Sequence, residues 1–124
     1  MTAGEILAAV DRLRPNQYSE AEKLSWLRRL DGQIQTELLD THPGEAGEET
    51  AAELPAYTPE TALLAPFPYG EELYNAYLFA QIDLHNAEIG KYNQSVAVLS
   101  AAWRQLADWI NRTRRPKGAA RLRL

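Results

Sequence analysis

The chain has 124 residues, of which 45% are hydrophobic and 24% are charged, values that are ordinary for a globular protein of one domain. It contains no cysteine, which excludes disulfides, thiolate nucleophiles and cysteine-based zinc sites. No apolar run reaches about 18 residues, and no basic region precedes an apolar stretch at the N-terminus. The sequence therefore predicts neither a membrane span nor a secretory signal, and we expect a protein that is made and folded in a cytoplasm.

Charge is distributed unevenly along the chain. Residues 1–111 hold seven Lys/Arg and 17 Asp/Glu, whereas residues 112–124 hold six basic residues and no acidic one. Such a tail can attract nucleic acid, an acidic protein surface or the acidic body of a neighbouring copy, and it can equally be a disordered solubilising end. We divide the chain into a helical domain, 1–111, and a basic tail, 112–124. The candidate basic contacts are Arg112, Arg114, Arg115, Lys117, Arg121 and Arg123.

Two capping boxes open the predicted N-terminal helices. Thr2 with Glu5, and Ser19 with Glu22, have the Ser/Thr-x-x-Glu spacing in which hydroxyl and carboxylate satisfy the free amides of a first helical turn. Apolar residues then recur three and four positions apart, which indicates one buried face on each helix. These residues are Ile6, Val10 and Leu13 in the first helix and Leu27, Leu30, Ile34 and Leu38 in the second.

The stretch from about 41 to 59 lacks this period. It is rich in acidic residues and turn formers and has no basic residue, which predicts an acidic loop. An extended aromatic elbow, Pro66-Phe67-Pro68-Tyr69, follows and leads into the next helix.

From Leu78 to Ile110 apolar and aromatic positions recur three and four residues apart, without a change of phase at Gly90. This predicts one continuous helix from about Tyr69 to Asn111, longer than the core of so small a chain requires. The predicted fold is all-α, a small bundle in which two N-terminal helices pack on one long C-terminal helix, with the acidic loop between. The seam consists of Leu78, Ile82, His85, Ile89, Tyr92, Val96, Leu99, Trp103, Leu106 and Ile110.

Few residues indicate catalysis. Asp83, His85 and Glu88 could be imagined as an acid/base or metal cluster, because residues three and four apart share a helix face. His85 occupies a seam position, however, which favours a packed or partly buried structural histidine. His42 has no second histidine at metal-binding spacing and no nucleophile beside it. The chain also lacks a glycine-rich phosphate loop and a G-x-S-x-G motif. We expect a protein that is not an enzyme and uses no metal or cofactor.

Aromatic residues are numerous along the predicted long helix. Tyr92 and Trp103 lie on the seam, where packing inside the subunit explains them. Residues off the seam are better candidates for a surface that meets a partner, because exposed aromatic side chains favour contact. The candidate interface residues are Tyr69, Tyr74, Tyr77 and Trp109.

Nearly the whole chain resembles a family of small proteins from tailed bacteriophages and prophages, whose genes lie near the major capsid gene. In the C-terminal half, the resemblance is carried by Leu64-Ala-Pro-Phe-Pro-Tyr69-Gly-Glu-Glu-Leu-Tyr74-Asn-Ala-Tyr77-Leu-Phe-Ala-Gln-Ile-Asp83, by Asn86-Ala-Glu-Ile-Gly-Lys-Tyr92-Asn-Gln-Ser95 and by Asn111-Arg-Thr113. In the N-terminal half, it is carried by Pro15-Asn-Gln-Tyr-Ser19, Lys23-Leu-Ser-Trp-Leu27 and Leu30-Asp-Gly-Gln-Ile34. The basic extension after Pro116 departs from the usual end of that family.

The resemblance implies a head–tail connector, or head-completion adaptor. Such a protein joins the capsid to the tail at the neck of the virion, after synthesis in the bacterial host cytoplasm. It implies a homo-oligomeric ring that binds the portal protein and the tail or neck proteins, with passing contact to DNA and no membrane. The acidic loop would become ordered on assembly, against a basic surface of the portal or the basic tail of an adjacent copy.

Two other classes remain open. A nucleic-acid-binding module would use the basic tail, although the acidic body opposes the approach of DNA and no recognition-helix motif is present. An assembly factor or a host-directed regulatory protein would also be small and helical, and would be absent from purified particles.

Overall fold

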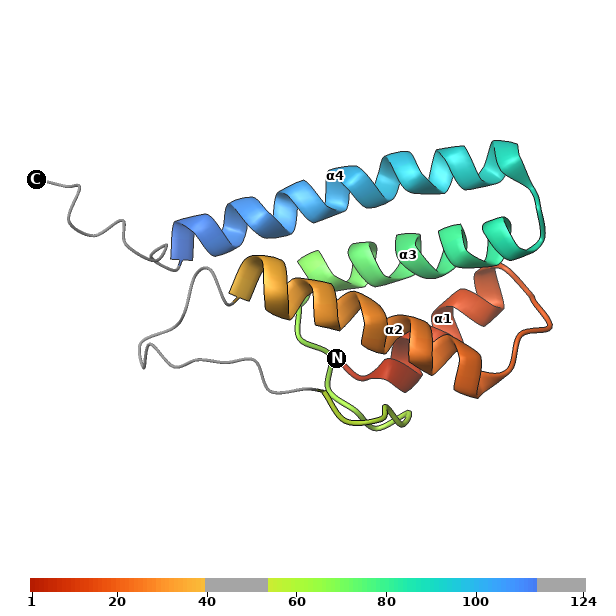
Figure 1. Cartoon of the computed structure of the whole chain (residues 1–124), viewed down its shortest axis with the longest axis horizontal. Coiled ribbons are helices and arrows are strands. Elements are labelled where there is room, and N and C mark those ends of the chain that lie inside the picture. The colour runs from red at the N-terminus through yellow and green to blue at the C-terminus, as the bar shows by residue number, and fades with distance from the viewer. Residues whose placement is uncertain (40–53, 114–124) are drawn as a thin grey trace, which may run out of the picture.

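The computed structural model describes residues 1–39 and 54–113, and four α-helices account for most of them (Figure 1). These are α1 (Ala3–Leu13), α2 (Glu20–Ile34), α3 (Tyr69–His85) and α4 (Ile89–Thr113), and a π-helical turn, η1 (Gln35–Leu39), continues α2. The described ranges contain no β-strand, although Thr2 and Ala62 form an isolated antiparallel bridge. The prediction of a small all-α bundle is confirmed.

Both predicted capping boxes are present. The Thr2 hydroxyl accepts from the Glu5 N–H at 3.3 Å, and the Glu5 carboxylate accepts from the Thr2 N–H at 2.9 Å. Ser19 and Glu22 repeat the arrangement at the start of α2, with both hydrogen bonds at 3.1 Å. A helix N-cap of this kind contributes about 0.5–2 kcal/mol. At α1 the segment before α3 adds two further partners, since the N–H groups of Ala3 and Gly4 donate to the Thr61 and Pro59 carbonyls at 2.9 and 2.8 Å.

The prediction of one long helix from Tyr69 to Asn111 is wrong, because this segment is an antiparallel hairpin. Helix α3 ends at His85, and α4 begins at Ile89 and runs back beside α3 (Figure 1). The turn between them has three residues, close to one helical turn, so the apolar spacing keeps its phase while the chain reverses direction. The two arms of this segment pack against each other, which accounts for a length that seemed excessive for one subunit.

The hairpin turn is held by backbone hydrogen bonds at the end of α3. Ala87 has a left-handed backbone conformation, with φ of 60°. Its N–H donates to the Leu84 carbonyl at 3.0 Å, and the Glu88 N–H donates to the Asp83 carbonyl at 2.9 Å. These bonds satisfy carbonyl groups that a helix terminus leaves free, as in other left-handed helix ends.

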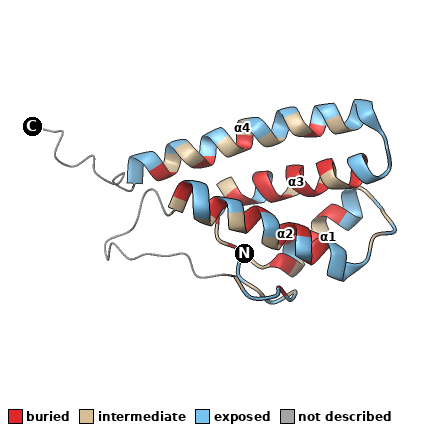
Figure 2. Cartoon of the chain, in the orientation of Figure 1, coloured by how far each residue is buried: buried red, intermediate tan, exposed pale blue. Residues whose placement is uncertain are grey.

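Helix α3 lies in the middle of the bundle. Helices α1 and α2 pack on it from one side and α4 from the other (Figure 1). Within the described ranges, the backbone of α4 closely approaches α3 and η1 but neither α1 nor α2. Burial follows this arrangement, since α3 is mostly buried whereas four of the 25 residues of α4 are buried (Figure 2).

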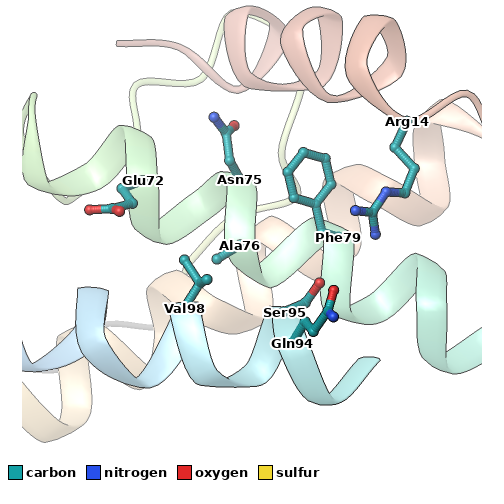
Figure 3. Close-up of a pocket in the computed structure, with 8 residues that line it drawn as sticks. All are labelled: Arg14, Glu72, Asn75, Ala76, Phe79, Gln94, Ser95 and Val98. Atoms are coloured by element: carbon teal, nitrogen blue, oxygen red, sulfur yellow. The ribbon is translucent and has the colours of Figure 1, made fainter. Parts of the chain in front are cut away.

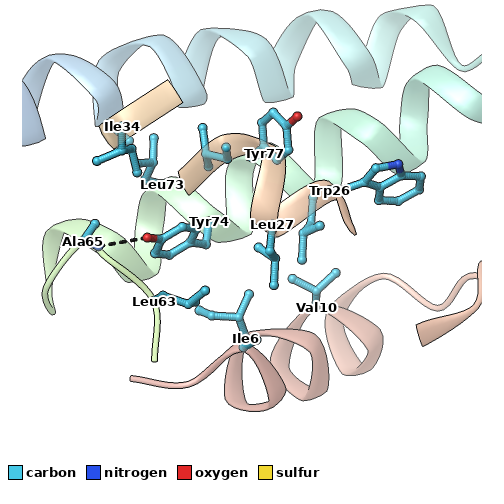
Figure 4. Close-up of a cluster of buried hydrophobic side chains, with 14 of the residues drawn as sticks. Ile6, Val10, Trp26, Leu27, Ile34, Leu63, Ala65, Leu73, Tyr74 and Tyr77 are labelled. Carbon is cyan, nitrogen blue, oxygen red and sulfur yellow. Dashed lines mark hydrogen bonds between the residues drawn. The ribbon is translucent and has the colours of Figure 1, made fainter. Parts of the chain in front are cut away.

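The core fills the space between α1, α2 and α3, and Tyr74 of α3 reaches its centre (Figure 4). The predicted apolar faces of the first two helices are buried, with the exception of Leu13, which is 61% exposed because α1 ends there. The predicted seam is buried at Leu78, Ile82, Leu106 and Ile110, but His85 and Ile89 flank the hairpin turn and are exposed.

The aromatic elbow fits tightly against the first turn of α3. A Cβ at Gly70 would lie 2.5 Å from the Ala65 carbonyl oxygen, closer than any side chain permits, so the approach requires glycine. The Gly70 N–H also donates to the Pro66 carbonyl at 2.7 Å. The elbow, which includes a cis Phe67–Pro68 bond, is therefore fixed to the helix that it precedes.

Candidate functional site

A surface groove with a volume of about 370 Å³ lies between α1 and α4, with α3 as its floor (Figure 3). We call it the α1–α4 groove. Asn75 and Phe79 project into it from α3, and Val98 lines it from α4 (Figure 3). Its lining residues are Arg14, Glu72, Asn75, Ala76, Phe79, Gln94, Ser95 and Val98.

The buried Asp83 carboxylate holds one end of this groove together. Nη1 of Arg14, just after α1, donates to both carboxylate oxygens at 2.7 and 2.6 Å. The Ser95 hydroxyl of α4 donates to the same carboxylate at 3.0 Å. Since Asp83 is fully buried, a cation and a hydroxyl are needed to offset its loss of water, and these partners connect the end of α1 to α3 and α4.

Two polar side chains also line the groove. The guanidinium of Arg14 lies 4.5 Å from the ring centroid of Phe79, and the Arg14 side chain remains 31% exposed. The Oδ1 atom of Asn75 is buried and has no hydrogen-bond donor in the described parts of the chain. Because a buried acceptor without a donor is costly, Asn75 is a natural contact for an incoming N–H or O–H group.

A second groove, of about 350 Å³, lies on the other flank of α4. Its walls are α2 with η1 and α4, and Tyr77 of α3 contributes to its floor. The two grooves exist because α4 packs mainly on α3, and no other described helix covers either of its flanks. The lining residues of this α2–α4 groove are Leu30, Gln33, Glu37, Tyr77, Leu99, Ser100, Trp103 and Arg104.

A buried carboxylate on α2, Asp31, fixes the segment that leads to α3. It accepts hydrogen bonds from the Tyr57 hydroxyl at 2.6 Å, from the Tyr74 hydroxyl and from the Leu64 N–H at 3.2 Å. Burial raises the pKa of Asp31 above its usual range, and the three donors partly counteract this shift. The same burial and the neighbouring carboxylate raise the pKa values of both phenols.

The predicted aromatic interface is only partly at the surface. Tyr74 is fully buried and Tyr77 is 7% exposed, so the expectation that both lie on an exposed aromatic face is wrong. The reason is the hairpin: α3 is covered from both sides, which leaves little of it for a partner. Tyr69 and Trp109 are half-buried and stack on each other, with ring centroids 5.6 Å apart, where the start of α3 meets the end of α4.

His85 is an exposed residue in an aromatic cluster. Its ring stacks on Trp26 at 5.1 Å between centroids and contacts the edge of Tyr18 at 5.9 Å. It is therefore packed against other rings, although it is not in the core as its seam position suggested.

The remaining candidates lie at or beyond the limits of the described residues. Arg112 is exposed in the last turn of α4. His42, most of the acidic loop and the other basic candidates, Arg114, Arg115, Lys117, Arg121 and Arg123, lie outside the described residues.

Sequence reasoning missed the structural roles of the two buried aspartates. Asp31 lies four residues after Leu27 and three before Ile34, so it interrupts the apolar face of its helix. A carboxylate at such a position is a signal of a buried polar group. Asp83 has no comparable local signal, because its partners Arg14 and Ser95 are remote in the sequence or belong to the other arm of the hairpin.

Searches against protein-family models, curated proteins and solved structures found no match for this chain.

Among the residues that the structure describes, no group of three His, Asp or Glu side chains is placed to hold a metal ion. No described helix has the length and apolar character to cross a membrane.

Proposed function

We propose that the protein is a non-catalytic head–tail connector of a tailed bacteriophage or prophage, which joins the capsid to the tail through the portal protein and the neck or tail proteins. The observation that carries the proposal is the exposure of α4, because four of its 25 residues are buried and it has an open groove on each flank. A helix presented in this way is suited to packing against neighbouring subunits. The family resemblance supports the same role.

Charge supports a place beside a DNA channel. The acidic body, residues 1–111, would repel the DNA that passes through a neck, while the basic tail offers a contact to an acidic surface. Assembly as a homo-oligomeric ring would let each copy offer the same surfaces to the portal. The protein would be made in the host cytoplasm and would reside at the neck of the virion.

The test is peptide mass spectrometry of purified virions, or of particles from the induced prophage, quantified against the portal and major capsid proteins. We expect the chain at near-portal stoichiometry. Its absence from mature particles, despite abundant expression in the infected cell, would contradict the connector and favour an assembly or host-directed regulatory factor. Salt-dependent DNA binding that is lost on deletion of residues 112–124 would instead support a nucleic-acid-binding module.

A further inference from the structure

Phe67 is an exposed apolar side chain on a braced segment. It is 69% exposed, more than any other large hydrophobic residue described. The elbow that carries it is held by the hydrogen bond from Gly70 to Pro66, and by one from the Ala65 N–H to the Tyr74 hydroxyl at 2.9 Å. An aromatic ring on a fixed backbone loses little conformational freedom on docking, so it makes an effective anchor at an interface.

The α1–α4 groove offers an apolar site of sufficient size. Ala76 and Phe79 form its apolar floor, and Val98, which is 47% exposed, forms one wall. A cavity of about 150 Å³ already accommodates benzene, and this groove has about 370 Å³. Phe67 of the same chain does not occupy it, since that ring remains exposed.

The polar groups of the elbow and the groove are complementary. Pro66 and Pro68 have no N–H, and the N–H of Phe67 has no acceptor among the described residues. The groove has a buried acceptor without a donor, Oδ1 of Asn75. A hydrogen bond from the Phe67 N–H to Asn75 would satisfy both groups if the Asn75 side chain turns toward the ring as it enters the groove.

One charged contact is also available between the two surfaces. Glu71 is exposed in the first turn of α3, directly after the elbow. At the groove, Nη1 of Arg14 binds Asp83, whereas its Nε and Nη2 groups have no acceptor in the described part of the chain. Glu72 lines the opposite end of the groove from Arg14 (Figure 3). An elbow that enters beside Arg14 would therefore bring Glu71 to a cation.

We propose that the Phe67 elbow of one copy docks into the α1–α4 groove of a second copy. The two surfaces differ, so the contact is heterologous, and successive copies add in one direction until the rotation closes a ring. The inference rests on the proposed function, because it names the surface through which subunits of the connector meet. It assigns Phe67 as the anchor and the Val98 wall as its receptor.

The absence of cysteine from the chain allows a direct test by disulfide formation between single-cysteine variants. Pro66→Cys, at an exposed position of the elbow that leaves the Phe67 ring in place, is mixed with Val98→Cys of a different mass in concentrated solution under oxidising conditions, and the mixed disulfide is followed over time. Ser100→Cys, an exposed position on α4 in the α2–α4 groove, replaces Val98→Cys in the matched control. Reaction of each thiol with a soluble disulfide reagent, and the circular dichroism of each variant, verify access and folding.

We expect Pro66→Cys to form the mixed disulfide with Val98→Cys at least about tenfold faster than with Ser100→Cys, because a docked contact raises the effective thiol concentration. Equal rates, faster reaction with Ser100→Cys, or no mixed disulfide would overturn the proposal. Preferential dimerisation of Pro66→Cys with itself would also overturn it, since that requires an isologous contact. If particles contain the chain but the cross-link does not form, the docking proposal is wrong and the connector proposal stands. If the cross-link forms but the chain is absent from particles, only the connector proposal is contradicted.

Discussion

Asp31 and Asp83 are both fully buried, but their carboxylates are stabilised in different ways. Asp83 is paired with the guanidinium of Arg14 and the hydroxyl of Ser95. Asp31 is held by neutral donors, two phenols and a backbone amide. Neutral donors compensate for lost hydration less fully than a cation does, which is why burial raises the pKa of Asp31.

The raised pKa of Asp31 predicts a pH dependence of stability. The native state binds this proton more tightly than the unfolded state, whose aspartate pKa is about 3.9. The contribution of Asp31 to the free energy of unfolding is therefore fully present below that pKa and is lost as pH rises through the native pKa.

Urea unfolding of the wild type and of Asp31→Asn over a series of pH values measures this effect, since asparagine does not titrate. We expect the stability of the wild type relative to Asp31→Asn to fall as pH increases. Asp108→Asn, at an exposed position of α4, is the control and should show a smaller change. A relative stability that grows with pH would mean that the native state favours the charged form of Asp31.

At the scale of elements, the three-residue turn between α3 and α4 determines the architecture. Ala87 adopts the left-handed conformation there, which costs a residue with a Cβ roughly 1–2 kcal/mol. The turn persists because the hairpin that it permits buries Leu78 and Ile82 of α3 together with Leu106 and Ile110 of α4. Packing between the two arms outweighs the local preference of the backbone.

Replacement of the left-handed residue tests this balance. Ala87→Gly should raise the free energy of unfolding by about 0.5–1 kcal/mol, because glycine adopts positive φ without the Cβ penalty. Ala97→Gly, at an exposed position in the middle of α4, is the matched control and should lower it by about 1 kcal/mol. Chemical denaturation measures both. Destabilisation by Ala87→Gly would indicate that the chain does not turn at this residue.

At the scale of the whole molecule, the helices differ in how many neighbouring elements pack on them. Helix α3 is packed by α1, α2 and α4, whereas α4 packs on α3 and, among the other described elements, approaches η1 alone. The uncovered flanks of α4 are the two grooves, so the side of the bundle with the least internal support is also the side most available to a partner.

Native-state hydrogen exchange resolves this difference. We expect amides of α3 to exchange most slowly, near the limit set by global unfolding, and amides in the N-terminal half of α4 to exchange faster through local opening. The global limit is measured independently by urea unfolding under the same conditions. Equal protection of α3 and α4 in the monomeric chain would contradict a peripheral α4.

The start sites of α1 and α2 and the apolar face of α2 were predicted correctly, because caps and helix periodicity depend on residues within a few positions of one another. The single long helix was predicted wrongly, since the turn at Ala87 preserves the periodic spacing and has no glycine or proline to mark it. The burial of Tyr74 and Tyr77 follows from that reversal, which local pattern does not reveal.

The sequence by itself therefore determined the all-α class, the N-terminal helices and the uneven charge, all of which depend on composition or neighbouring residues. The elbow before α3 was predicted to be extended, whereas it is a turn, with Pro68 in the α-helical region. Only the tertiary structure decided that α4 folds back on α3, that Asp31 binds Tyr57 and Tyr74, and that Arg14 meets Asp83. Those contacts join residues far apart in the chain, or across a turn that leaves the apolar period unchanged. Their pairing is selected by the burial of the whole core.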